Sequence, residues 1–355
     1  MNEPSQPSWQ TEAVFRARVR GCLLGGALGD ALGYPVEFSS LESIRAAHGD
    51  RGVTGLVPDA DGVIGRISDD TQMTLFTVEG LRQAHERERA KGIGGGALQL
   101  LRQAYGRWLY TQRKPRPDEG NRGLWGEAWL YARRAPGNAC LSGLAGEAVP
   151  DPHVPLGPPG PVNPGSKGCG AVMRSAPFGL TGAPADRAFA LAAHCAQITH
   201  GHPTGYYAAG ALAATIAHVV RDGDSVEGAV LRTLRLLARH PGHEETAAAL
   251  EHALDLAADG EPSAGKVEKL GQGWVAEEAL AIGVYCALAA PSVSEALLLA
   301  VNHSGDSDST GSVCGNLLGA RHGDVGLPHA WLEHVEGRAV IGTLADDLAA
   351  ECTRR

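Results

Sequence analysis

Apolar residues recur at spacings of three and four over most of the chain from residue 186 onwards. This period is typical of helices, whereas a half-buried strand alternates apolar and polar residues. We find no convincing alternating segment and no internal repeat. Helices are expected over 188–197, 206–220, 226–238, 244–258 and 274–289. The pattern therefore predicts an all-α fold.

The first half of the chain alternates between helical segments and loops. Helices are expected over 11–32, from the 67–74 segment to about 88, and from the glycines at 92–96 to 110. Prolines and glycines dominate residues 150–170, too densely for a helix or a central strand. Long connections inside a compact domain are usually functional. We predict one compact domain of orthogonally packed helices over 11–345, with its active site in loops at one end. Tails are expected at 1–10 and 346–355.

Glycine recurs at every fourth position of the first predicted helix, at Gly21, Gly25, Gly29 and Gly33. This spacing lays a groove along one helix face, where a second helix can approach closely. A phosphate-binding loop is the alternative, but no strand precedes the glycines and no Gly-Lys-Ser/Thr follows them. Asp30 on the same helix is expected to be a buried, paired carboxylate.

Composition and charge narrow the class of protein. The 355 residues carry a formal net charge of −9, which argues against nucleic acid as a partner. The seven cysteines form no CxxC pair, which favours a reduced cytoplasmic protein over a disulfide framework. The polar first ten residues hold no secretory signal, and no apolar run is long enough to span a bilayer. We therefore expect no membrane partner.

Two acidic segments stand at the start of predicted helices. In the first, Asp69 and Asp70 lie between Ser68 and Thr71, and four hard oxygen donors in a row suit a small divalent cation. An ordinary capped helix, with Asp69 as the N-cap and Gln72 as its partner, is the alternative. The second segment, 305–310, is again acidic and rich in hydroxyls. Two such segments suggest one shared metal site.

A glycine-rich segment, 166–172, closes the long Pro/Gly-rich connection. Successive glycines ahead of a helical run expose backbone N–H groups that suit a phosphate or pyrophosphate. A flexible loop entering a helix is the alternative. Further along, His200 and His202 lack a third ligand at zinc-site spacing, so either is better read as a hydrogen-bonding partner of a ligand.

Together, in this order, the motifs resemble the ADP-ribosylglycohydrolase family, which includes the dinitrogenase reductase-activating glycohydrolases. The resemblance extends from about Arg18 to His322. It rests on the opening helix with Glu37, the Ser-Asp-Asp-Thr segment, the glycine-rich loop ending in Met173-Arg174-Ser175-Ala176-Pro177, the Thr-His-Gly-His-Pro turn, Gly273-Trp274-Val275-Ala276-Glu277, and Gly305-Asp306-Ser307-Asp308-Ser309. It implies an all-α fold that carries two Mg²⁺ or Mn²⁺ ions. The implied reaction is hydrolysis of the bond between ADP-ribose and an acceptor, with an arginine linkage favoured and ADP-ribose as product.

The resemblance also implies roles for individual residues. Asp308 bridges the two metals, and Glu37 or Asp118 transfers the proton. The implied metal ligands are Ser68, Asp69, Asp70, Asp306, Asp308 and Ser309. The implied substrate-binding residues are Ser166, Lys167, Gly168, Cys169, Gly170, Ala171, Met173, His200 and Trp274. The implied partner is an ADP-ribosylated protein or small molecule.

The chain departs from the family pattern at a few positions. Serine stands at Ser68 and Ser309, where the family usually has threonine, so the hydroxyl ligand is kept with a looser rotamer. Lys167 and Cys169 replace small polar residues, which bears on acceptor choice. Three alternatives stay open: an inactive ADP-ribose-binding module, a hydrolase of serine, small-molecule or nucleobase linkages, and a phosphohydrolase that cuts the pyrophosphate.

Overall fold

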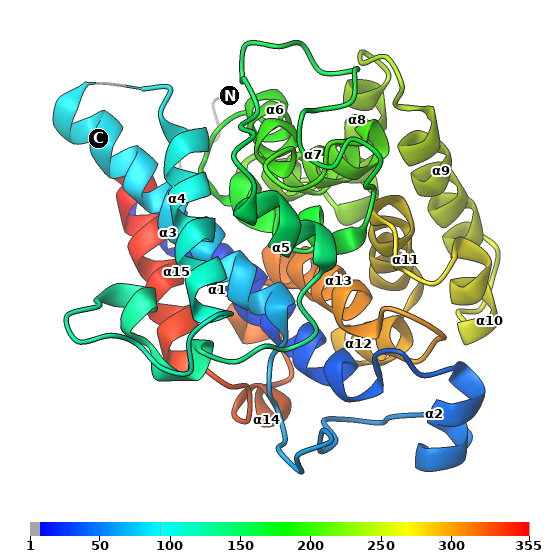
Figure 1. The fold of residues 1–355 in the computed structure, drawn as a ribbon. Helices are drawn as coiled ribbons and strands as arrows, with labels where there is room; N and C mark the ends of the chain where they lie inside the picture. Colours follow the sequence, from blue (N-terminus) through cyan, green and yellow to red (C-terminus); the bar gives the residue numbers. More distant parts are fainter. Residues whose placement is uncertain (1–7, 93, 355) are drawn as a thin grey trace.

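Helices and loops make up the whole of the computed structural model, which describes residues 8–92 and 94–354 (Figure 1). Within these ranges no strand occurs, which confirms the all-α prediction. The helices form one compact domain with the bounds α1 (Ser8–Gly33), α2 (Leu41–His48), α3 (Asp69–Lys91), α4 (Ala97–Thr111), α5 (Asn138–Ala145), α6 (Ala185–Ala196), α7 (Pro203–Ala217), α8 (Val226–Leu237), α9 (Glu244–Ala258), α10 (Ala264–Val267), α11 (Ala276–Ala289), α12 (Val293–Val301), α13 (Ser307–His322), α14 (His329–Leu332) and α15 (Arg338–Thr353). Of the described helices, none is both long and apolar enough to cross a membrane.

The glycine spacing of α1 is matched by a second glycine series on α13. Gly25 lies against Gly315 so closely that a Cβ on Gly25 would stand 2.3 Å from the Gly315 carbonyl oxygen. Gly29 meets Gly311 in the same way, and a Cβ there would lie 1.9 Å from that oxygen. Only glycine permits such an approach of two backbones. The predicted helix-packing groove is therefore confirmed.

The two helices run antiparallel, because Gly21 meets Gly319 while Gly33 meets Ser307. The end of α1 consequently lies beside the start of α13. The start of α3 joins them through Asp30, which accepts hydrogen bonds from the backbone N–H groups of Ser68 (2.9 Å) and Thr71 (3.1 Å). Asp30 is fully buried, as its sequence position predicted. Three helix ends thus meet at one point.

Two predicted boundaries differ from the structure. The expected C-terminal tail at 346–355 is wrong, because α15 continues to Thr353 and buries Leu348 and Ala349. Its Glu351 also pairs with Arg89 of α3, at 2.7 Å. At the other end α1 begins at Ser8, and residues 1–7 of the expected tail lie outside the described residues.

Candidate active site

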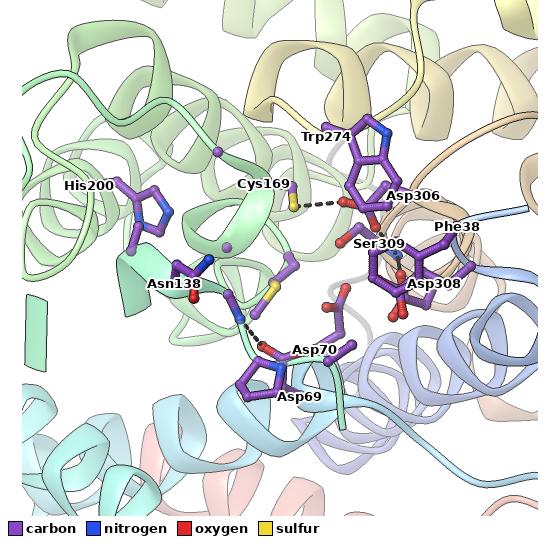
Figure 2. Close-up of a pocket in the computed structure, with 18 residues that line it drawn as sticks. Phe38, Asp69, Asp70, Asn138, Cys169, His200, Trp274, Asp306, Asp308 and Ser309 are labelled. Atoms are coloured by element: carbon purple, nitrogen blue, oxygen red, sulfur yellow. Dashed lines mark hydrogen bonds between the residues drawn. The ribbon is translucent and has the colours of Figure 1, made fainter. Parts of the chain in front are cut away.

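A cavity of about 450 Å³ opens where the three helix ends meet (Figure 2). Five carboxylates lie on its wall. They are accompanied by the glycine-rich loop, by the segment 135–139, and by a pair of aromatic side chains. The lining residues that matter below are Glu37, Phe38, Asp69, Asp70, Asn138, Gly168, Cys169, Gly170, Met173, His200, Trp274, Asp306, Asp308 and Ser309.

Both acidic segments lie at helix starts, as predicted. The N-cap of α3 is Ser68 and not Asp69, because the Ser68 side chain accepts the backbone N–H of Asp70, at 3.2 Å. Asp69 and Asp70 then occupy the first turn. The N-cap of α13 is Asp306, and Asp308 follows inside the first turn. These positions face the positive ends of two helix dipoles, which favour negative charge. Ser68 itself is buried and does not line the cavity.

No basic side chain of the described part of the chain forms an ion pair with the cavity carboxylates. Glu37, Asp306 and Asp308 bring one carboxylate oxygen each within 4.8 Å of one another. Burial, and then the negative charge of Asp308, raises the pKa of Glu37, Asp69, Asp70 and Asp306 above the ordinary value. The main electrostatic feature of this site is therefore a group of closely spaced carboxylates without a positively charged partner among the described residues.

The donor set fits a hard divalent cation. The Oδ2 atom of Asp70 is buried and has no hydrogen-bond partner among the described residues. Such an orphaned oxygen is costly unless a ligand satisfies it. Carboxylate and hydroxyl oxygens favour Mg²⁺ or Mn²⁺ over zinc. Glu37, Asp69, Asp70, Asp306, Asp308 and Ser309 are the residues that fit a metal.

The glycine-rich loop is brought to the cavity only in part. Gly168, Cys169 and Gly170 line it, and the Cys169 thiol donates to Asp306 at 2.7 Å. Ser166 lies in a neighbouring hollow instead, and Ala171 is buried outside the lining. Lys167 turns away to ion pairs with Glu245 and Glu277. Of the loop residues expected to bind substrate, Gly168, Cys169 and Gly170 thus lie on the cavity wall, whereas Ser166, Lys167 and Ala171 do not.

Beneath this loop lies a fully buried arginine. Arg174 donates to the Gly170 carbonyl at 2.8 Å and to the Thr199 hydroxyl at 2.6 Å, and it lies over the Tyr105 ring. Thr199 in turn contacts the Nδ1 atom of His200, at 2.7 Å. Burial, reinforced by the Arg174 charge, lowers the pKa of His200 to about 3, so this histidine is neutral at physiological pH. Arg174 thus holds both the loop and His200 in place.

The structure does not bring Asp118 to the cavity. Its side chain is exposed and accepts a hydrogen bond from the Tyr110 hydroxyl, in the loop that follows α4. The loop sequence resembled a functional one, but the structure places the loop at the surface, outside the lining of the cavity. A catalytic role for Asp118 is therefore not supported by its position.

Sequence reasoning missed two parts of the cavity wall. The segment 135–139 contributes the backbone N–H of Gly137, which lies 3.4 Å from the Asp69 carboxylate. Phe38 contributes an exposed ring. Both segments contain a residue with positive φ, Ala135 at 53° and Phe38 at 65°. In the sequence, Phe38 is marked only by following Glu37, and the segment 135–139 only by containing a proline. Neither feature indicates a binding site.

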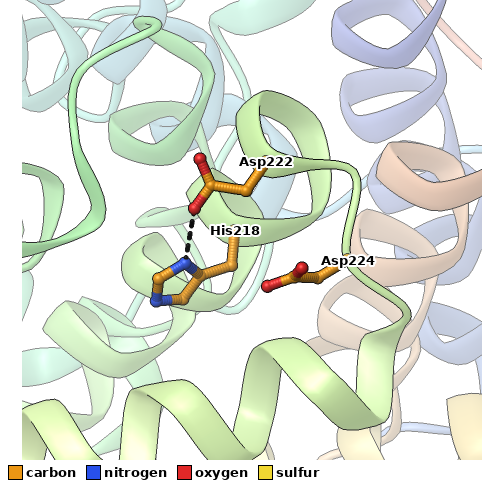
Figure 3. A group of neighbouring side chains, drawn as sticks. All are labelled: His218, Asp222 and Asp224. Carbon is orange, nitrogen blue, oxygen red and sulfur yellow. Dashed lines mark hydrogen bonds and ion pairs between the residues drawn. The ribbon is translucent and has the colours of Figure 1, made fainter. Parts of the chain in front are cut away.

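A second set of possible metal ligands lies far along the chain, where a π-helical turn, His218–Asp222, ends α7 (Figure 3). His218, Asp222 and Asp224 also bring ligand atoms within 4.8 Å. Arg232, however, lies 2.9 Å from Asp222 and 2.7 Å from Asp224. This set is an ion-pair network with its own cation.

Fold and cavity define an all-α protein with an acidic site of the kind that takes divalent cations. The profile of the ADP-ribosylglycohydrolase family matches residues 11–355, so the chain belongs to that family. It is 27% identical to the ADP-ribosyl-(dinitrogen reductase) glycohydrolase of Rhodospirillum rubrum over 327 residues, which cover 90% of each chain. It is 23% identical to ADP-ribosylhydrolase ARH3 of Bos taurus over 383 residues, covering 94% of this chain and 92% of that relative. A solved chain of an ADP-ribosylglycohydrolase-related protein complex has the same fold, with a TM-score of 0.64 at 22% identity over 96% of this chain and 100% of that one.

Proposed function

We propose that this protein hydrolyses the glycosidic bond between ADP-ribose and an acceptor, with two Mg²⁺ or Mn²⁺ ions at the cavity acids. The single observation that carries the proposal is a cavity with five carboxylates, four buried and Glu37 half-buried, that have no basic partner among the described residues and lie beside a glycine-rich loop. The names of the relatives refer to hydrolysis of ADP-ribosyl linkages, which supports the same reaction here. The substrate would be an ADP-ribosylated protein or small molecule, with an arginine linkage favoured.

Two walls of the cavity would have different roles, one in binding the nucleotide and one in the reaction. The backbone at 168–170 and the neutral His200 would hold the pyrophosphate and the adenosine side. The acids would surround the distal ribose, where the transition state is oxocarbenium-like and negative charge is stabilising. Bound ions would supply Lewis-acid chemistry and a lowered pKa for water.

Proton transfer is assigned to Glu37. It lines the cavity and is only half-buried, whereas the other four acids are buried, so it is the cavity acid most accessible to water. One carboxylate oxygen of Asp308 lies within 4.8 Å of one from Glu37 and one from Asp306, so Asp308 would hold an ion together with either of them. A cytoplasmic location is proposed as well, because all seven cysteines are free.

The test is incubation with defined ADP-ribosyl linkages, with the products separated. Release of free ADP-ribose supports the glycohydrolase. Release of AMP would identify a phosphohydrolase, and binding without any product would identify an inactive binding module. A parallel reaction in EDTA checks metal dependence.

A further inference from the structure

An aromatic pair forms one wall of the cavity. The rings of Phe38 and Trp274 stack with centroids 5.1 Å apart and an interplanar angle of 25° (Figure 2). Phe38 is 69% exposed, and its φ of 65° lies in the left-handed region. A bulky residue pays conformational energy there, and its exposed ring gains little from burial. Phe38 therefore makes no evident contribution to the stability of the fold.

Backbone hydrogen bonds anchor the main chain that carries each ring of the pair. The Phe38 N–H donates to the Gly305 carbonyl at 3.3 Å, directly before the acids of α13. The Trp274 carbonyl accepts the N–H of Cys169 at 3.1 Å. Gln272, two residues before Trp274, accepts the N–H of Asp306 at 2.8 Å. The main chain beneath the two rings is thus tied to the start of α13 and to the glycine-rich loop.

The position of the Phe38 and Trp274 rings relative to the acids indicates which part of a substrate the rings would contact. In Figure 2, Asp70 and Asp306 lie between His200 on one side and Phe38 on the other. With the nucleotide over the glycine-rich loop and the scissile bond at the acids, the acceptor projects toward the rings. This step rests on the function proposed above.

We propose that Phe38 and Trp274 form the acceptor-binding surface and select a planar cation, the guanidinium of an arginine side chain. Guanidinium groups stack on aromatic faces and gain from the ring quadrupole, most strongly with tryptophan. The lining of the cavity holds no lysine or arginine among the described residues, so no positively charged side chain there repels a guanidinium. A serine-linked acceptor has no planar cation to stack on the rings.

The experiment compares Trp274→Ala, Phe38→Ala and the conservative Trp274→Phe on arginine-linked and serine-linked ADP-ribosyl peptides. For the arginine linkage, Trp274→Ala is expected to raise KM roughly tenfold and Trp274→Phe to keep most of the affinity. The affinity for ADP-ribose alone, measured by calorimetry, should change by less than about twofold. The matched control is Trp125→Ala, which removes a tryptophan from the Tyr110–Trp125 pair outside the cavity.

The experiment distinguishes failure of the acceptor proposal from failure of the proposed reaction. Equal losses on both linkages, or a loss of ADP-ribose affinity, would show that the rings bind the ADP-ribose moiety and would overturn the proposal. Unchanged kinetics in Trp274→Ala and Phe38→Ala would overturn it too. If the wild type releases ADP-ribose from no linkage, the proposed reaction fails instead. The arginine-linked peptide is then not consumed, and its calorimetric affinity for wild type and Trp274→Ala still decides the acceptor proposal.

Discussion

Two sets of possible metal ligands in this molecule bring their ligand atoms within the same limit of distance. Glu37, Asp306 and Asp308 lie within 4.8 Å of one another in the cavity, and His218, Asp222 and Asp224 do so near the surface (Figures 2 and 3). The surface set is paired with Arg232. The cavity set has no basic partner in the described structure.

The pKa values of Asp222 and Asp306 shift in opposite directions. Partial burial acts to raise the pKa of Asp222, but the hydrogen bond from His218 and the charge of Arg232 lower it overall. In the cavity, burial and like charges raise the pKa of Asp306. Proximity of acids is thus no sign of a metal site by itself. The informative feature is buried negative charge without an internal cation.

Chelation should have the largest effect. EDTA is expected to abolish ADP-ribose release and Mg²⁺ or Mn²⁺ to restore it, because the cavity acids lack any other cation. Metal at 100 times its dissociation constant should stabilise the fold by about 2.7 kcal/mol, seen as a rise in Tm. The control is Asp222→Asn, which should show the same metal-dependent rise. Full activity after exhaustive chelation would remove the basis of the two-metal proposal.

Asp308→Asn tests the centre of the cavity set. Turnover should fall on the order of 10²-fold or more, because the residue proposed to bridge the two ions is lost. The fold should remain, since one fewer acid relieves repulsion in the metal-free site. Metal content, thermal unfolding and ADP-ribose release are measured together, with Asp224→Asn as the matched surface control. A folded variant with full metal content and wild-type turnover would contradict the assignment.

Glu37→Gln tests the proton-transfer role. A loss of about 10²-fold in kcat is expected, because a positioned acid or base typically contributes that much. Asp118→Asn is the comparison, and its exposed position predicts a change of less than about twofold. A large loss of kcat in Asp118→Asn together with a small loss in Glu37→Gln would reverse the two assignments.

Asp222→Asn should have the smallest effect. It is expected to lower the free energy of unfolding by about 0.5 kcal/mol at pH 7, because the pair is largely exposed and solvent screens it. Since the folded-state pKa of Asp222 is depressed, this stabilisation is present above the unfolded value near 3.9 and is lost as the pH falls through the folded value. Denaturant unfolding at pH 7 and at about pH 3 measures the difference. A cost that grows toward low pH would contradict the ion-pair interpretation.

Local patterns in the sequence were enough for several features. The period of the apolar residues identified the helices, because burial on one helix face repeats every three to four residues. The acid segments were placed at helix starts, because capping and the helix dipole act within one turn. The spacing of Gly21, Gly25 and Gly29 predicted a close helix contact.

The partner of each segment was decided only by the tertiary structure. Gly311 and Gly315 lie nearly 300 residues from the glycines that they meet, and this packing places Glu37 beside Asp306. The same long-range packing stacks the Phe38 ring on Trp274 and pairs Lys167 with Glu277. It also leaves Asp118 at the surface. Loop side chains take their direction from neighbours distant in sequence, and no local period records those neighbours.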